Sequence, residues 1–116
     1  MIIIQMKEFY IHLFHILIVG TMFLYVGIKS TNTPAFMYPI LLTLGIIIVL
    51  YHLYKTYVKV SAGKNPWVNL IHILIVGPLL IYIGYNNKAT QRPAYELLLM
   101  LGFAAIGYHG YYAVAE

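Results

Sequence analysis

The chain has 116 residues, of which 62% are hydrophobic and only 9% are charged. So few polar groups cannot cover the surface of a soluble globular protein, so the composition predicts an integral membrane protein. The net charge of +4 comes from basic residues that are scattered over the polar segments, which excludes a dense nucleic-acid-binding patch. The chain contains no cysteine, so disulfides and thiolate metal sites are also excluded.

Four long stretches without charge are each close to the ~20 residues that a helix needs to cross the hydrocarbon core of a bilayer. They predict spans at about residues 9–28, 36–57, 66–85 and from Pro93 onward. The predicted fold class is therefore all-α, a four-helix bundle forming one transmembrane domain over residues 1–116. Residues 1–8 lack the pattern of a cleavable signal, so the first span is expected to remain in the mature protein.

Polar segments rich in turn formers separate the predicted spans. Residues 29–34 end the first span, residues 58–66 link the second span to the third, and residues 86–92 precede the fourth. In the linker, Asn65 and Pro66 have the pattern of an N-cap followed by a first-turn proline. Pro78 is expected to kink the third span, whereas Thr21 occupies the equivalent place in the first.

Residues 14–54 recur at residues 71–111 with a constant offset of 57 and no gap, and the segment His-Ile-Leu-Ile-Val-Gly is identical at 15–20 and 72–77. This self-similarity predicts a tandem duplication of a helical hairpin, with repeats at 9–57 and 66–114. Each repeat contains an even number of spans, so the two copies are expected to share one orientation. They would then be related by a pseudo-two-fold axis along the membrane normal.

Four spans place both chain ends on the same side of the membrane. The expected side is the cytoplasmic or inner one, because basic residues are slightly more frequent in the segments on that side. The terminus side has Lys7, Lys55, Lys59 and Lys64, and the opposite side has Lys29, Lys88 and Arg92.

Both copies retain glycine and tyrosine at a spacing that defines helix faces. Residues seven apart lie on one face of a helix, and glycine on such a face allows a neighbouring backbone to approach closely. The predicted helix-packing residues are Gly20, Gly27, Gly45, Gly77, Gly84 and Gly102, and the predicted polar stripe contains Tyr38, Tyr51, Tyr95 and Tyr108.

Four histidines are predicted at one depth, roughly 8–10 Å below the interface on the terminus side at ~1.5 Å per residue. They are His15, His52, His72 and His109, two from each repeat. Three interpretations are open. The imidazoles can be hydrogen-bonded packing groups, ligands of haem or a divalent transition metal, or members of a proton or ion path. His12 adds a possible fifth ligand, although Asn69 replaces it in the second copy.

The sequence has no combination of residues typical of an enzyme active site. It lacks a Ser/His/Asp set, paired carboxylates, a phosphate-binding glycine loop and a His-x-x-Glu-His helix. Its three acidic residues, Glu8, Glu96 and Glu116, all fall at the predicted membrane edges. The chain is therefore expected not to be an enzyme.

The two-copy pattern resembles small hydrophobic proteins encoded by large DNA viruses of algae and protists. The resemblance rests on His-Ile-Leu-Ile-Val-Gly-Pro-Leu-Leu-Ile-Tyr-Ile-Gly at 72–84 and Gly-Tyr-His-Gly-Tyr-Tyr at 107–112. It implies a place in a viral inner membrane or beneath a capsid, and no site residue follows from it. Together with the glycine faces, it leads us to expect a structural or assembly component that packs in the lipid bilayer as a homo-oligomer or in a larger membrane assembly.

Overall fold

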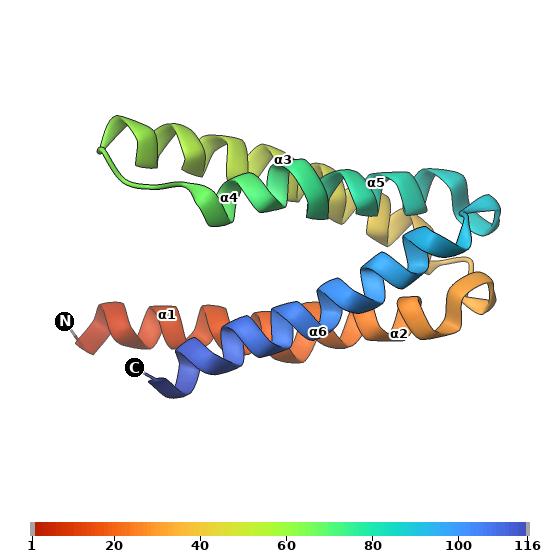
Figure 1. Ribbon diagram of the computed structural model, residues 1–116, viewed down its shortest axis with the longest axis horizontal. Coiled ribbons are helices and arrows are strands. Elements are labelled where there is room, and N and C mark those ends of the chain that lie inside the picture. The colour runs from red at the N-terminus through yellow and green to blue at the C-terminus, as the bar shows by residue number, and fades with distance from the viewer. Residues whose placement is uncertain (1, 116) are drawn as a thin grey trace. The chain divides into compact units, whose positions relative to one another are not determined.

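The computed structural model describes residues 2–115, and the side chains of residues 6–115, as helices joined by short turns (Figure 1). The all-α prediction is confirmed. Four helical stretches are long and apolar enough to cross a membrane, and each overlaps one of the predicted spans. They are Met6–Asn32, Met37–Ser61, Trp67–Ala89 and Arg92–Ala115.

The helices form two compact units. The terminal unit combines Met1–Asn32 with Arg92–Glu116, and the central unit is Thr33–Gln91. The first span therefore packs with the fourth, and the second packs with the third. The hairpin repeats predicted at 9–57 and 66–114 do not coincide with these units, because each repeat has one span in the terminal unit and one in the central unit.

The terminal unit is an antiparallel helix pair. Its first helical stretch consists of α1 (Ile2–Phe14), the π-helical turn η1 (His15–Gly20), α2 (Thr21–Lys29) and the 3₁₀ turn η2 (Ser30–Asn32). The second is the single helix α6 (Arg92–Ala115), which contacts α1, η1 and α2. Figure 1 shows that α1 begins and α6 ends at the same end of this unit.

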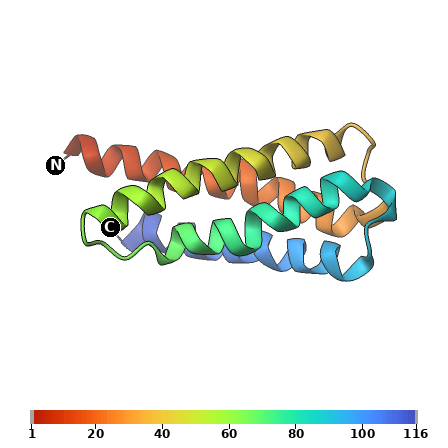
Figure 2. The same cartoon turned by 90° about the horizontal axis from the view of Figure 1, so that it is seen from above.

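The central unit is a second antiparallel pair, in which α3 (Met37–Ser61) lies beside α4 (Trp67–Ile71), the π-helical turn η3 (His72–Val76) and α5 (Gly77–Asn86) (Figures 1 and 2). The 3₁₀ turn η4 (Asn87–Ala89) closes it. The linker pattern predicts an N-cap at Asn65 and a first-turn proline at Pro66, but Pro66 itself occupies the N-cap position and α4 begins at Trp67. Asn65 lies one residue before the N-cap, and its Oδ1 accepts a hydrogen bond of 3.0 Å from the backbone N–H of Trp67.

Each unit contains one π-helical turn, and both turns begin at the histidine of the repeated segment. In the central unit the backbone N–H of Gly77 donates to the carbonyl of His72, five residues earlier. Pro78 follows immediately, but the terminal unit has the same turn with Thr21 in that place. The irregularity therefore accompanies the shared segment and does not depend on the proline that was expected to kink the third span.

The π turn changes which residues share a face. In a regular α-helix five residues cover roughly 1.4 turns, so His15 and Gly20 would point in different directions. In a π turn five residues complete roughly one turn, because the hydrogen bond spans i to i+5. His15 and Gly20 consequently both face α6, where they meet His109 and Ile106.

In both helix pairs, glycines allow the backbones of the two helices to come into contact. A Cβ added to Gly84 would lie 2.5 Å from the backbone nitrogen of Leu42, and one added to Gly27 would lie 2.9 Å from the backbone nitrogen of Leu99. These two contacts are equivalent under the offset of 57, and two further pairs of contacts have the same equivalence. Gly20 meets Ile106 as Gly77 meets Val49, and Gly102 meets Leu24 as Gly45 meets Ile81.

The C-terminal ends of α2 and α5 also have the same backbone conformation. Ser30 has φ 54° and ψ −127°, and Asn87, at the equivalent position, has φ 55° and ψ −131°. Both residues follow a helix and donate their backbone N–H to the carbonyl four residues earlier, Val26 and Ile83. Glycine adopts such positive φ values without strain, and other residues rarely do, so this shared conformation is a specific feature of both units.

We expect Gly84→Ala to lower the free energy of unfolding by about 1–3 kcal/mol, because the new methyl group would collide with the α3 backbone and force the pair apart. Gly107→Ala is the matched control. Gly107 lies within α6 with nothing within 4 Å of its Cβ position, so alanine there should raise stability by about 0.5–1 kcal/mol. Unfolding of the protein in mixed micelles by increasing SDS measures both values. Equal effects of the two variants would contradict close glycine packing.

Candidate functional site

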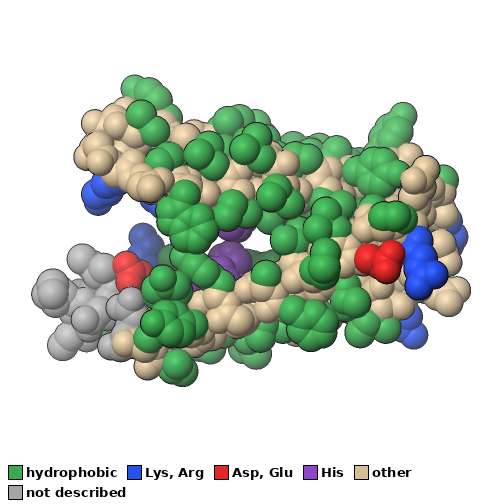
Figure 3. Space-filling view, in the orientation of Figure 1, with side chains coloured by type: hydrophobic (Ala, Val, Ile, Leu, Met, Phe, Trp, Pro, Cys, Tyr) green, Lys and Arg blue, Asp and Glu red, His purple; other side chains and the backbone are tan. Residues whose placement is uncertain are grey.

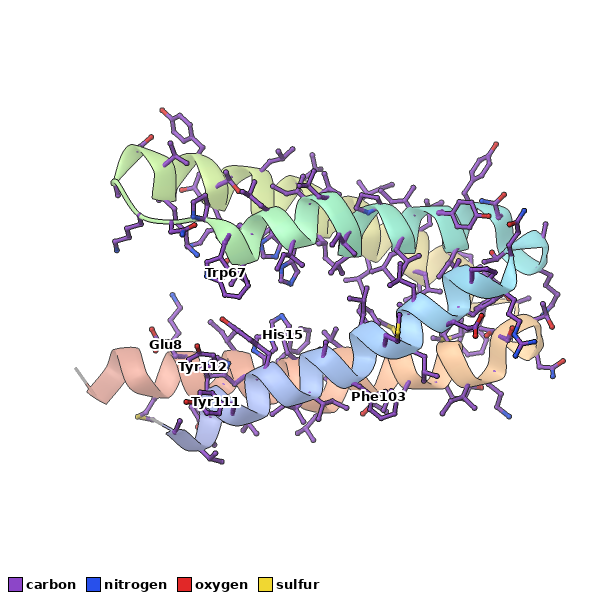
Figure 4. All side chains as sticks on the ribbon, in the orientation of Figure 1. Glu8, His15, Trp67, Phe103, Tyr111 and Tyr112 are labelled. Carbon is purple, nitrogen blue, oxygen red and sulfur yellow. The ribbon has the colours of Figure 1, made fainter. Side chains whose placement is uncertain are left out.

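The terminal unit contains a cluster of three histidines, which we call the terminal histidine cluster: His12, His15 and His109. His15, at the start of η1, stacks on His109 of α6 with ring centroids 4.1 Å apart and an angle of 19° between the rings. His12, one turn earlier on α1, approaches the same ring, with 2.8 Å between the two Nδ1 atoms. Figure 4 labels His15 and shows it on the opposite side of this helix pair from Phe103.

The central unit contains a matching group, the central histidine cluster: His52, Asn69 and His72. The rings of His52 on α3 and His72 on η3 stack with centroids 4.1 Å apart and an interplanar angle of 16°. The amide nitrogen of Asn69 donates to Nδ1 of His52 over 2.7 Å. The two clusters therefore have the same geometry at positions 57 residues apart, and they differ in composition only where Asn69 replaces His12.

Backbone hydrogen bonds fix the orientation of one ring in each stack. His15 donates from Nδ1 to the carbonyl of Ile11 over 2.8 Å, and His72 donates from Nδ1 to the carbonyl of Val68 over 2.7 Å. A carbonyl oxygen only accepts, so Nδ1 must carry the proton in both rings. Each imidazole is thus tied to its own helix one turn earlier and presents a defined face to its partner.

The other ring of each stack receives a hydrogen bond from the neighbouring helix. The amide N–H of Asn69 donates to Nδ1 of His52, so a neutral His52 holds its proton on Nε2. In the bond between His12 and His109 one Nδ1 must donate and the other must accept. Equivalence with the central cluster assigns the donor to His12 and the acceptor to His109.

The structure places the four histidines that the sequence singled out as two stacked pairs, His15 with His109 and His52 with His72. A single layer of all four remains a prediction. Among the described residues 2–115, no three His, Asp or Glu side chains come together in a way that could hold a metal ion. Two imidazoles from one pair are the most that either unit offers on its own.

The tyrosines of the predicted polar stripe occupy two kinds of place. Tyr38 and Tyr95 are almost completely buried, and the Lys88 ammonium lies 5.6 Å from the centroid of the Tyr38 ring. Tyr51 and Tyr108 lie edge-on to the histidines that follow them, with centroids 5.1 Å apart in both units. The first two therefore fill the core, and the second two flank the histidine stacks.

Figure 3 shows hydrophobic side chains over most of the visible face, with acidic and basic side chains toward the ends. The ion pair of Arg92 with Glu96, 3.8 Å long, is exposed and lies at the start of α6. Exposed pairs of this kind contribute little to stability. The polar chemistry within the spans is therefore mainly that of imidazole, amide and hydroxyl groups.

One member of the site, Asn69, was not identified from the sequence as a hydrogen-bond partner of a histidine, and appeared there only as the residue that replaces His12. Its position in the repeat could have identified it, because an asparagine in place of a histidine is still a polar group that can donate a hydrogen bond. The π turns carried no recognisable signal beyond the identity of the repeated segment.

We expect His12→Asn to change the free energy of unfolding by about 1 kcal/mol or less, because the amide can donate to His109 as Asn69 donates to His52. His12→Leu should cost about 1–3 kcal/mol, because it removes this donor from a buried imidazole nitrogen. SDS titration of both variants in mixed micelles gives the comparison. If leucine were tolerated as well as asparagine, the hydrogen bond to His109 would not contribute to stability.

Comparison of the chain with protein-family models, curated proteins and solved structures finds no match in any of the three.

Proposed function

We propose that this chain is a structural component of a membrane, a four-helix bundle that acts by packing and not by catalysis. The observation that carries the proposal is that all five histidines use Nδ1 in a hydrogen bond within their own unit. Two of these bonds, His12 to His109 and Asn69 to His52, join neighbouring helices, as expected of polar groups that hold helices together. The bonds of His15 and His72 to their own helix orient the rings that stack on His109 and His52. The stacked rings add contact area next to the close helix contacts at Gly20 and Gly77.

The outer surfaces support assembly in lipid. Large apolar side chains are exposed on every predicted span, among them Leu17, Leu50, Leu74 and Met100, each more than 60% exposed. Exposed apolar surface of this extent is typical of protein that faces lipid or other protein. We propose that lipid covers part of it and that further copies of the chain cover the rest, so that the protein works as a homo-oligomer.

The equivalence of the two units supports a tandem duplication of one hairpin. Each unit pairs the first span of one repeat with the second span of the other, using the same glycine contacts and the same histidine stack. Two copies of a two-span ancestor that exchanged partners in this way would give the present arrangement once joined in one chain. The pseudo-two-fold relation along the membrane normal belongs to this proposal.

The setting of the protein is proposed from the sequence. Its resemblance to small hydrophobic proteins of large DNA viruses favours a viral membrane or a layer between capsid and membrane. The distribution of lysine and arginine favours both chain ends on the cytoplasmic or inner side.

A second candidate function is binding of haem or a divalent transition metal. It is favoured by the orientation of His15 and His72, since histidines that ligate a metal usually donate their other N–H to a carbonyl or carboxylate. With Nδ1 donating, Nε2 is the nitrogen that would bind the metal. His52 and His109 accept a hydrogen bond at Nδ1 and hold their proton on Nε2, so each would have to change its tautomer to serve as the second ligand.

One experiment separates the two candidates. We expect the native protein, purified in mild detergent without chelators, to be colourless, free of stoichiometric metal and larger than a single chain. The double variant His52→Gln/His109→Gln should keep this size, because a glutamine amide can replace the imidazole in its hydrogen bond. Absorption spectra, elemental analysis and light scattering give the readouts.

A Soret band or a stoichiometric metal that disappears in the double variant would establish the second candidate and contradict the packing role of the histidines. A native protein that is strictly one chain per particle would contradict assembly through its outer surfaces.

A further inference from the structure

Two buried oxygen atoms of the central unit have no hydrogen-bond partner in the protein. They are Oδ1 of Asn69, a residue only 4% exposed, and Oγ1 of Thr56. Over the described part of the chain these are the buried side-chain polar atoms without a partner. Buried polar atoms are nearly always bonded to protein or to ordered water, so each of the two needs an explanation.

Asn69 binds His52 directly, and Thr56 lies close to His52 along α3. The amide of Asn69 binds Nδ1 of His52 through its nitrogen, and its oxygen takes no part in that bond. Thr56 is one helical turn after His52 on α3, so it lies on the same face of that helix.

The packing of α3 against α4 brings Thr56 and Asn69 to one level. The two helices are antiparallel and in contact, and the rings of His52 and His72 stack between them. Thr56 is one turn after His52, and Asn69 is three residues before His72. In an antiparallel pair these two steps lead in the same direction from the stack, toward the end of the unit that bears the 62–66 linker.

The chemistry of the surroundings restricts what can bind. An amide oxygen only accepts hydrogen bonds, whereas a threonine hydroxyl both donates and accepts. The central unit, residues 33–91, contains no Asp or Glu, and Lys55 and Lys59 flank Thr56 on α3. This environment disfavours a cation, and the amide oxygen cannot bind an anion. A small neutral hydrogen-bond donor satisfies both oxygens.

We propose that Thr56 and Asn69 hold one buried water molecule beside the central histidine cluster. The water donates to Oδ1 of Asn69 and exchanges a hydrogen bond with Oγ1 of Thr56. Asn69 in turn donates to His52, so the stacked imidazoles are joined through the amide to a polar group at the linker end of the unit. This inference is independent of the proposed structural role.

The terminal unit serves as an internal control. The positions equivalent to Thr56 and Asn69 are Ala113 and His12, so the terminal cluster has neither the hydroxyl nor the amide oxygen. His12 instead completes a direct hydrogen bond to His109. The water site is therefore a property of the central unit alone, although the two units agree in their helix contacts and ring stacks.

Solid-state NMR with magnetisation transferred from water protons tests the proposal on the isotope-labelled protein in lipid bilayers. We expect the Asn69 and Thr56 side chains to receive magnetisation from water several-fold faster than the buried core residue Leu80. The variant Thr56→Ala/Asn69→His gives the central unit the residues of the terminal unit. In this variant the transfer to the His52 ring should fall several-fold, to the rate seen for His109.

The reverse variant, Ala113→Thr/His12→Asn, should raise the transfer to His109 by a similar factor and provides a second test if the first variant does not fold. Transfer to Asn69 no faster than to Leu80 would overturn the proposal. So would equal transfer to His52 in the native protein and in the folded first variant. A signal that depends on exchanging Na⁺ for K⁺ would indicate a bound cation and would also overturn it.

Discussion

Close approach of two antiparallel helices at glycine is the constraint on which each unit depends. At Gly27 and Gly84 the facing backbone comes so near that no side chain fits, and this distance sets the positions of the residues further along the seam. Packing of this kind supplies van der Waals contact in lipid, where burial of apolar surface gives little driving force. The imidazole rings then stack at the level where the helices pass each other beyond Gly20 and Gly77.

The π turns connect the glycine seams to the histidines. Without the extra residue in the turn, His15 and His72 would point away from the face on which Gly20 and Gly77 lie. Local irregularities of this type are frequent at functional sites in helices, and here both of them contain the sequence His-Ile-Leu-Ile-Val. The repeated segment therefore specifies a backbone shape as well as an apolar surface. This accounts for the identity of the segment at 15–20 and 72–77, while many of the surrounding apolar residues differ.

Much of the architecture could be predicted from the sequence, because length and composition determine how many helices can cross a bilayer. The glycine faces were also predictable, because a spacing of seven selects one face of a regular helix. The partner of each face was not. Periodicity does not show that Gly27 meets Leu99 and Gly84 meets Leu42, since helix rotation and pairing depend on tertiary contacts. The pairing of His15 with His109 could not be predicted for the same reason. In addition, the π turn rotates His15 to a direction that regular helix geometry does not give it.

The pairing of the first span with the fourth, and of the second with the third, is tested most directly by cross-linking in this cysteine-free chain. The double variants His15→Cys/His109→Cys and His52→Cys/His72→Cys place thiols at the two ring stacks, where a short bifunctional thiol reagent can join them. The account predicts a cross-link within one chain for both variants, detected as a faster-migrating monomer on a denaturing gel, with the single-cysteine variants as controls. Cross-links that form only between different chains, or none in either variant, would contradict it.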